Sequence, residues 1–342
     1  MNYLNAQNIN CRALSEHLDR KRFKVATMLY PVQNAADFVR LDDVKYIKQI
    51  RPLRWLVWFG YMRGILWADV AYLPKGEVDG FCRTVAKLSG TKVFTTIEGI
   101  MDDIILSRYD DKQKPIRRFK KYQDRLYSIT RYIVHRELQV NDIHCNNTIL
   151  YLGVDTKRFI HPHIQHDSLD NIIFIGNDPI RKNLVEYLEV AKLFPSISFN
   201  IAGGNQLKEC TLEEYVEKEG LKNVVYHGSL DHTKLSMLLK SMDLMYFPSR
   251  SEGFPKVMLE TACAGVPTLC YNDYGAYEWI TTGKDGYVVQ TKEEAIRIIS
   301  DLKAHPEKLQ ELSRNAVELG KRFDWSVLVK QWENVIQTIY NE

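Results

Sequence analysis

The sequence lacks the patterns that mark several large classes of protein. Its six cysteines are scattered and form no C-x-x-C pair, and no histidines recur at zinc-finger spacing. This distribution excludes a zinc finger and fits a reducing compartment. No uncharged apolar run reaches about 18 residues, so we expect no transmembrane helix. The opening residues, MNYLNAQNINCRAL, contain no signal-peptide core, and the expected location is the cytoplasm.

The sequence also has little excess of charge of either sign, with 46 Lys and Arg residues against 43 Asp and Glu residues. The formal net charge is +3, which is too small to indicate a nucleic-acid partner by itself. The chain is 45% hydrophobic and 26% charged, the composition of a globular protein with an ordinary core. It shows no short repeat and no low-complexity tract. At roughly 100–200 residues per domain, the 342 residues predict two domains or one large one.

The second half of the chain alternates short apolar runs with segments of helical spacing. The expected strands are 171–177, 197–204, 223–228, 243–249, 267–272 and 286–289. The expected helices are 184–194, 211–220, 232–242, 255–264, 292–303, 306–321 and 325–340. Strands that alternate with helices indicate a parallel, doubly wound sheet.

The first half follows the same style more loosely. It predicts a helix at 11–21 and strands at 23–31, 69–74, 91–99, 132–137 and 147–153. A polar segment, HPHIQHD, then precedes a new strand, which places a domain boundary there. We therefore expect an acceptor-binding domain at 1–162, a nucleotide-sugar-binding domain at 163–324 and a C-terminal helix at 325–342. Two such Rossmann-like halves leave a cleft, and ligands bind beyond the carboxyl ends of the strands.

One segment of the second half, SRSEGFPKVMLETACAGVP (249–267), has the residues of a strand-to-helix turn that binds an anion. Pro255 suits the first turn of a helix, where a missing N–H costs nothing. Gly253 allows the backbone to approach a ligand closely. The free N–H groups of the helix start favour an anion, and Lys256 adds a positive charge. The turn therefore predicts a phosphate cradle.

Two glutamates flank this cradle. Glu252 precedes the helix and Glu260 lies within it, so each can accept from a hydroxyl on a different side of a bound diphosphate. A nucleotide sugar has hydroxyls in both places. The alternative interpretation is a capped surface helix that carries two solvated acids.

The same segment resembles the donor-binding signature of glycosyltransferase family 4, whose members are retaining, nucleotide-sugar-dependent enzymes of the GT-B fold. The resemblance continues through YGAYEWITTGKDGYVV (274–289) and includes YLGVDTKRF (151–159), where Leu152 replaces the usual Asn. It implies an α/β protein of two Rossmann-like domains that face a central cleft, with the C-terminal helix returning to the N-terminal domain. The implied activity is transfer of a sugar to a glycan or lipid-linked acceptor in surface polysaccharide biosynthesis.

The resemblance also assigns roles to residues. Glu252 is expected to contact the donor sugar, Glu260 the ribose, and Lys182 the leaving diphosphate. The backbone near the sugar and diphosphate belongs to Gly253, Phe254, Pro255, Lys256 and Val257, and further donor-binding positions are Gly176, Asn177, Arg181 and Gly203. Asn177 stands where the family has an arginine. Arg181 either supplies the missing charge or is an ordinary solvated residue.

No metal and no other cofactor is expected. No D-x-D motif ends a predicted strand, and the Asp-Asp pairs 42–43, 102–103 and 110–111 lie in the first half. Charge builds on the departing diphosphate during transfer, and preorganised cations can stabilise it in place of a metal.

The first half is expected to hold the acceptor. Glu98 takes the place of a histidine in relatives and is a candidate for the acceptor base or a sugar contact; the alternative is an ordinary loop acid. Residues 51–70 carry three Trp and three Arg, and residues 112–125 carry seven basic residues. Both predict contact with an anionic membrane surface, although each also fits a partly buried helix with a solvated face.

Two further interpretations remain at this point. The family opens with a strand and a Gly-rich loop, and this chain begins almost at that loop, so the first strand is expected to be missing or short. That feature and Asn177 favour a catalytically weak or inactive nucleotide-sugar-binding subunit. A GT-B-fold nucleotide-sugar epimerase is the third alternative.

Overall fold

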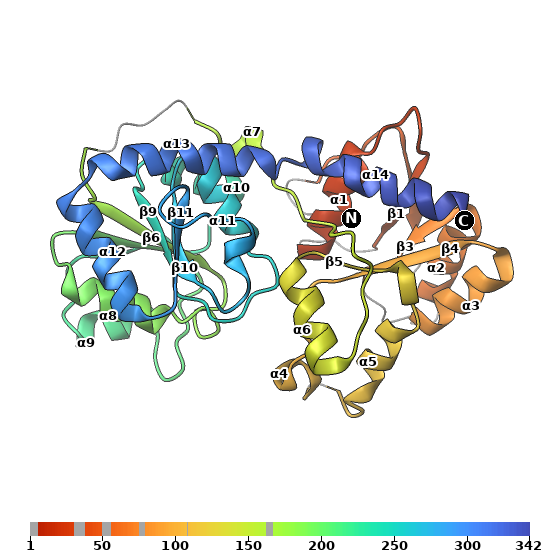
Figure 1. Cartoon of the computed structure of the whole chain (residues 1–342), viewed down its shortest axis with the longest axis horizontal. Coiled ribbons are helices and arrows are strands. Elements are labelled where there is room, and N and C mark those ends of the chain that lie inside the picture. Colours follow the sequence, from red (N-terminus) through yellow and green to blue (C-terminus); the bar gives the residue numbers. More distant parts are fainter. Residues whose placement is uncertain (1–5, 31–37, 50–55, 75–78, 108, 162–166) are drawn as a thin grey trace. The chain divides into compact units, whose positions relative to one another are not determined.

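The computed structural model describes residues 6–30, 38–49, 56–74, 79–107, 109–161 and 167–342. The chain forms two compact units (Figure 1): unit 1 comprises Met1–Gly153 and Trp325–Glu342, and unit 2 comprises Val154–Asp324. The division therefore lies at Gly153, whereas the sequence indicated residue 162. Residues 154–161 stay with unit 2 because Val154 forms a parallel bridge with Asp324 and Phe159 is buried.

Unit 2 is built on one six-stranded sheet. Its strands are β6 (Asn171–Gly176), β7 (Ser198–Gly203), β8 (Val224–Tyr226), β9 (Leu244–Phe247), β10 (Thr268–Tyr271) and β11 (Gly286–Val289). They pair in parallel in the order β11-β10-β9-β6-β7-β8. The chain moves outward from β6 through β7 to β8 and then returns to β9 on the other side of β6. The strand order thus reverses between β6 and β9, which is where ligands bind in open α/β sheets.

Helices cover both faces of this sheet (Figure 1). They are α7 (Thr156–Phe159), α8 (Leu184–Leu193), α9 (Leu212–Lys218), α10 (His232–Leu239), α11 (Lys256–Cys263), η2 (Ala276–Glu278), α12 (Lys292–Ala304) and α13 (Glu307–Arg322). Every second residue of the strands, such as Ile172 and Phe174, packs with α8, α9 and α12 into the main core. Strands buried on both faces read as continuous apolar runs, and this explains why the sequence predicted them well.

Unit 1 contains two smaller parallel sheets. The first pairs β1 (Val25–Leu29) with β2 (Val44–Lys48), and the second has the order β3 (Val70–Tyr72), β4 (Lys92–Ile97), β5 (Leu126–Ser128). The helices are α1 (Ala6–His17), α2 (Leu56–Trp67), α3 (Asp79–Ser89), α4 (Asp103–Leu106), α5 (Gln113–Lys120), η1 (Gln123–Arg125), α6 (Arg131–Asn141) and α14 (Trp325–Asn341). No helix within the described ranges is both long and apolar enough to cross a membrane.

Two strand predictions in unit 1 are wrong. Residues 132–137 belong to α6, because Thr130 caps the helix by accepting from the Ile133 N–H and the helix buries Ile133 and Glu137 one turn apart. Residues 147–153 form no strand; Ile149 makes a single bridge to Ser128. The expectation that the family's first strand is missing or short concerns residues 1–5, which lie outside the described residues.

The C-terminal helix α14 packs in unit 1, as the resemblance implied. The indole N–H of Trp332 donates to the Tyr151 carbonyl at 3.1 Å. Glu333 accepts from the Asp19 backbone N–H at 2.7 Å and lies 3.3 Å from Arg22. The last helix of the chain is therefore fixed to residues near its beginning.

Candidate functional site

Two loops meet where the strand order of unit 2 reverses. Residues 177–183 follow β6, and residues 248–255 follow β9. The first loop supplies Lys182, whose Nζ donates to Oε1 of Glu252 at 3.0 Å. Nη1 of Arg181 lies 3.0 Å from the same oxygen, and the Ser249 hydroxyl donates to it at 2.8 Å. One carboxylate oxygen thus gathers two cations and a hydroxyl.

Burial sets the electrostatics of this cluster. The side chain of Glu252 is 9% exposed and that of Lys182 is 12% exposed, whereas Arg181 is 41% exposed. Burial lowers the pKa of Lys182, and the Glu252 carboxylate opposes that shift. Nζ of Lys182 also lies 4.3 Å from the centre of the Phe247 ring, which favours a cation. The cluster therefore holds a preorganised, largely desolvated ammonium.

Glycines at the ends of β6 and β7 leave room for the Lys182 side chain and for the close approach of the two strand ends. A Cβ at Gly176 would lie 2.2 Å from Cδ of Lys182, so the lysine passes directly over this residue. Gly203 has φ +134°, and a Cβ there would lie 2.0 Å from the Gly176 carbonyl oxygen. The Gly204 N–H donates to that same carbonyl at 3.0 Å. The path of Lys182 toward Glu252 therefore depends on glycine at 176.

A second carboxylate, that of Glu186, holds the end of the loop 177–183 in place. Glu186, in the first turn of α8, accepts from the hydroxyls of Tyr246 at 2.6 Å and Tyr271 at 2.5 Å. Its other oxygen accepts from the Asn183 amide at 2.7 Å. Because Tyr246 and Tyr271 lie on β9 and β10, these bonds fix the start of α8 to the neighbouring strands and hold the turn that carries Lys182.

The start of α11 differs slightly from the prediction. Pro255 is the N-cap residue, and the helix begins at Lys256. Phe254 packs against Trp279 and Phe323, with ring centres 5.0 and 5.8 Å apart. The backbone N–H groups of a first helical turn, here those of Lys256 and Val257, point toward the loop that precedes the helix. Gly253 lies between Phe254 and Glu252, so a rigid aromatic contact fixes one side of the turn.

Glu260 has a partner that the sequence did not indicate. Its Oε1 lies 3.9 Å from Nε2 of His232, the first residue of α10. The Glu260 side chain is 13% exposed and that of His232 is 32% exposed. Nδ1 of His232 lies 3.1 Å from Nη1 of Arg158 in α7. Three segments far apart in the sequence therefore converge near Glu260.

Asn177 lies directly after β6, with its carbonyl oxygen 2.8 Å from the place of a Cβ on Gly204. Its neutral amide carries no charge, and the second cation beside Glu252 comes from Arg181. Asp178 holds that arginine: its Oδ1 accepts from the Arg181 N–H at 3.1 Å, and its Oδ2 lies 3.4 Å from Nε. The Arg181 guanidinium also donates to the Ser251 carbonyl at 2.7 Å.

Glu98 lies in unit 1, at the carboxyl end of β4. Its Oε1 accepts from the Thr96 hydroxyl at 3.2 Å and faces the Tyr72 hydroxyl at 3.5 Å. Burial, and then the charge of Glu98, raises the pKa of the Cys11 thiol to about 12. Glu98 is therefore a partly buried acid among polar groups, whereas the other candidate residues belong to unit 2.

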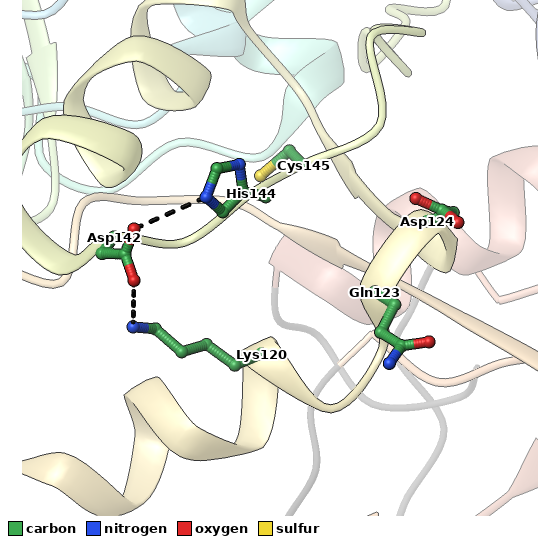
Figure 2. A pocket seen from close by; sticks show the side chains of 6 residues that line it. All are labelled: Lys120, Gln123, Asp124, Asp142, His144 and Cys145. Carbon is green, nitrogen blue, oxygen red and sulfur yellow. Dashed lines mark hydrogen bonds and ion pairs between the residues drawn. The ribbon is translucent and has the colours of Figure 1, made fainter.

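The two stretches with expected membrane contact also lie in unit 1. Residues 51–55 are outside the described residues, and α2 exposes Trp58, Phe59 and Leu66. Along 112–121 the exposed basic side chains are Lys112, Lys114, Arg117, Lys120 and Lys121. Beside this segment is a surface hollow lined by Lys120, Gln123, Asp124, Asp142, His144 and Cys145, in which Asp142 bridges Lys120 at 2.9 Å and His144 at 3.5 Å (Figure 2).

Among the residues with described positions, no group of three or more His, Cys, Asp or Glu side chains could hold a metal ion. Sequence reasoning missed Ser249, Glu186 and His232. Ser249 lies inside the quoted turn, and its distance of three residues from Glu252 was a usable signal. Glu186 and His232 gave none, because their partners lie on other strands and helices.

Comparison with known proteins gives a family match within unit 2. Residues 156–319 match the family model described as Glycosyl transferases group 1. This range lies within unit 2, Val154–Asp324. The matched range contains the clustered residues Arg181, Lys182 and Glu252, together with Glu260 and His232.

Similarity to curated proteins is concentrated in part of the chain. The chain is 31% identical over 158 residues to the lipopolysaccharide core biosynthesis mannosyltransferase LpsB of Rhizobium meliloti, and the match covers 40% of this chain and 43% of that protein. It is 30% identical over 137 residues to an uncharacterized 41.2 kDa protein in the cps region of Klebsiella pneumoniae, covering 40% of this chain and 36% of that protein. The match therefore spans less than half of either relative.

The fold comparison extends further. The structure of Anabaena Alr3699/HepE in complex with UDP and glucose matches with a TM-score of 0.77 at 14% identity, covering 99% of this chain and 97% of that one. At this identity the likeness establishes the fold alone. The α/β GT-B fold expected from the sequence is confirmed.

Proposed function

We propose that the chain is a retaining glycosyltransferase that moves a sugar from a nucleotide-sugar donor to a glycan or lipid-linked acceptor in surface polysaccharide biosynthesis. The observation that carries this proposal is the convergence of Lys182 and Arg181 on one oxygen of Glu252 at the point where the strand order reverses. Relatives that act in lipopolysaccharide synthesis or lie in a capsule region support the biological setting.

The chemistry follows from the charges. Breaking a glycosyl–phosphate bond leaves negative charge on the departing diphosphate, and fixed cations stabilise it without reorganisation. Lys182 and Arg181 supply those cations, and the N–H groups at the start of α11 add donors of their own. Glu252 then has a carboxylate oxygen within reach of sugar hydroxyls. No metal is required in this scheme, because the two side chains carry the charge that a metal would otherwise neutralise.

The acceptor is assigned to unit 1. Glu98 is proposed as its contact residue because a partly buried carboxylate at a strand end can accept a hydroxyl proton. The exposed basic residues of 112–121 and the exposed aromatics of α2 are proposed to bring the protein to the inner face of an anionic membrane, at about 1 kcal/mol per basic charge. A lipid-linked acceptor would then lie in the same plane.

The activity is tested by incubating the protein with UDP-, GDP-, dTDP- and ADP-sugars, with and without membrane lipid extract, and following nucleotide release and sugar identity. Release that depends on the extract supports a transferase. Interconversion of the sugar would instead identify an epimerase, and binding without turnover would identify a donor-binding subunit.

The membrane contact is tested separately with vesicles of phosphatidylcholine alone or with phosphatidylglycerol. We expect binding only to the anionic vesicles at low salt. Replacement of Lys112, Lys114 and Arg117 by glutamate should abolish it. Equal binding of this variant, or no binding of the wild type, would refute the membrane role and leave the transferase proposal intact.

A further inference from the structure

The contact between His232 and Glu260 suggests how the donor is selected. The distance from Nε2 to Oε1 is 3.9 Å, too long for a direct hydrogen bond. It is short enough for one oxygen atom to contact both groups. The Glu260 side chain is 13% exposed, so its carboxylate has lost most of its solvent but keeps some access to it. A ligand oxygen between the two residues could therefore form hydrogen bonds with both the His232 imidazole and the Glu260 carboxylate, which has little contact with water.

The tautomer of His232 follows from its other neighbour. Nη1 of Arg158 lies 3.1 Å from Nδ1 of His232. A guanidinium has only donors, so Nδ1 must accept and the ring proton must be on Nε2. Nε2 is the atom that faces Glu260. The arginine thus turns His232 into a hydrogen-bond donor aimed at the gap.

The position of the ring is also fixed. Phe159 packs edge-on against it with ring centres 6.0 Å apart at 86°. The Ser236 hydroxyl donates to the Arg158 carbonyl at 2.7 Å, which ties α7 to α10. The segment 155–159, which precedes the sheet of unit 2, therefore orients a side chain beside Glu260.

A donor N–H and an acceptor carboxylate that face one gap match a hydroxyl group, because a hydroxyl accepts one hydrogen bond and donates another. The family resemblance assigns a ribose hydroxyl of the nucleotide to Glu260; we infer that His232 donates to that same hydroxyl and thereby makes the site selective for ribonucleotide over deoxyribonucleotide donors. This inference rests on the proposed function, since it assigns the ribose of the proposed donor to Glu260. His232 acts as a specificity residue and takes no part in bond breaking.

The loss of one hydroxyl would leave the carboxylate and the imidazole N–H facing each other across an empty gap. Sites built to hydrogen-bond a substrate hydroxyl reject analogues that lack it, because partly buried polar groups are then left unpaired. We expect the wild type to bind its preferred ribonucleoside diphosphate about tenfold or more tightly than the 2′-deoxy or the 3′-deoxy form.

Calorimetric titration tests this with UDP, GDP and ADP, and then with the deoxy forms of the tightest binder. In His232→Ala the preference should fall to less than about threefold, because ribonucleotide affinity drops while deoxynucleotide affinity is retained. His232→Gln keeps an N–H of similar reach and should retain part of the preference. Lys234→Ala, an exposed change on the same helix, is the matched control and should keep all of it.

The outcomes separate this inference from the proposed function. Tight binding by the wild type with a preference that is the same in His232→Ala would overturn the role of His232 and leave the transferase proposal standing. No binding of any nucleoside diphosphate by a folded wild type would overturn both. Thermal melting of each variant checks folding, and the 32% exposure of the His232 side chain predicts melting temperatures close to the wild type.

Discussion

The ammonium of Lys182 lies 3.0 Å from Oε1 of Glu252, although 70 positions separate the two residues in the chain. They meet because β6 and β9 are neighbours in the sheet and each residue follows the carboxyl end of its strand. The pair is largely buried. A lysine and a glutamate held in this way can meet a ligand that carries both negative phosphates and hydroxyls.

Replacement of Glu252 by glutamine should lower sugar transfer at least tenfold, or about 1.4 kcal/mol of barrier. Glutamine keeps the shape but removes the charge that orients both Lys182 and Arg181. The measurement is initial-rate nucleotide release with the preferred donor. Glu217→Gln, on the exposed face of α9, serves as the control and should retain full activity. Full activity in Glu252→Gln would show that the carboxylate is not part of the site.

The pH dependence of nucleotide affinity should report Lys182. Burial lowers its pKa, so the lysine loses its proton at a lower pH than an exposed lysine does. The cation exists below that pKa and is lost above it, and affinity for a nucleoside diphosphate should therefore fall as pH rises. Lys182→Arg stays charged throughout. Between about pH 7 and 10 its affinity should stay level while that of the wild type declines; parallel profiles would contradict the assignment.

Arg181 is predicted to carry the charge that Asn177 lacks. Arg181→Ala should reduce transfer about tenfold, and adding Asn177→Arg in the same chain should restore part of the loss. Arg297→Ala removes a cation that is 72% exposed on α12 and should have no effect. If Arg181→Ala is as active as Arg297→Ala, the arginine is only a solvated residue.

Gly176→Ala should affect activity more than stability. The new Cβ would lie 2.2 Å from Cδ of Lys182, and a flexible side chain can move away at modest energetic cost. The ammonium would then leave Glu252, so we expect transfer to fall about tenfold with a small decrease in melting temperature. Gly80→Ala, where a Cβ meets nothing within 4 Å, is the control. Wild-type activity in Gly176→Ala would mean that Lys182 needs no fixed path.

Glu137 should make unit 1 less stable as pH rises. Its carboxylate is fully buried in α6 and accepts from the Met101 N–H and the Asn141 amide, yet burial raises its pKa above 4.5. A raised folded pKa means that its contribution is complete below about pH 4.5 and is lost as pH rises through the folded value. The free energy of unfolding is measured in urea for the wild type and for Glu137→Gln. The wild-type value minus the variant value should decrease as the pH rises from about 4.5 to about 7.5. An increase over that range would show that the two donors outweigh burial.

The sequence predicted most of the fold of unit 2 because its strands are buried on both faces and appear as uninterrupted apolar runs. Unit 1 was harder. Its strand β2 buries only Val44 and Ile47, three positions apart, so its five residues lack the alternation of a half-buried strand, and β5 has only three residues. The run YIV in α6 resembles a strand, and the cap at Thr130 together with the burial of Ile133 and Glu137 one turn apart decides for a helix.

For the site, the sequence indicated Glu252 and Glu260 through one local turn and its resemblance, and Lys182 through the family resemblance alone. It could not determine whether Arg181 reaches Glu252, since that depends on how two loops from different strands face each other. It gave no sign of His232, because the pairing with Glu260 joins the starts and middles of separate helices. Pairwise geometry across elements is what the structure adds.

The most direct test of the central claim is a calorimetric titration of wild-type protein and the double variant Arg181→Ala, Lys182→Ala with nucleoside diphosphates. We predict that the wild type binds at least one of UDP, GDP and ADP, and that the double variant binds it about 100-fold or more weakly while melting as a folded protein. Equal binding by both proteins, or no binding by the wild type, would contradict a diphosphate site at the ends of β6 and β9.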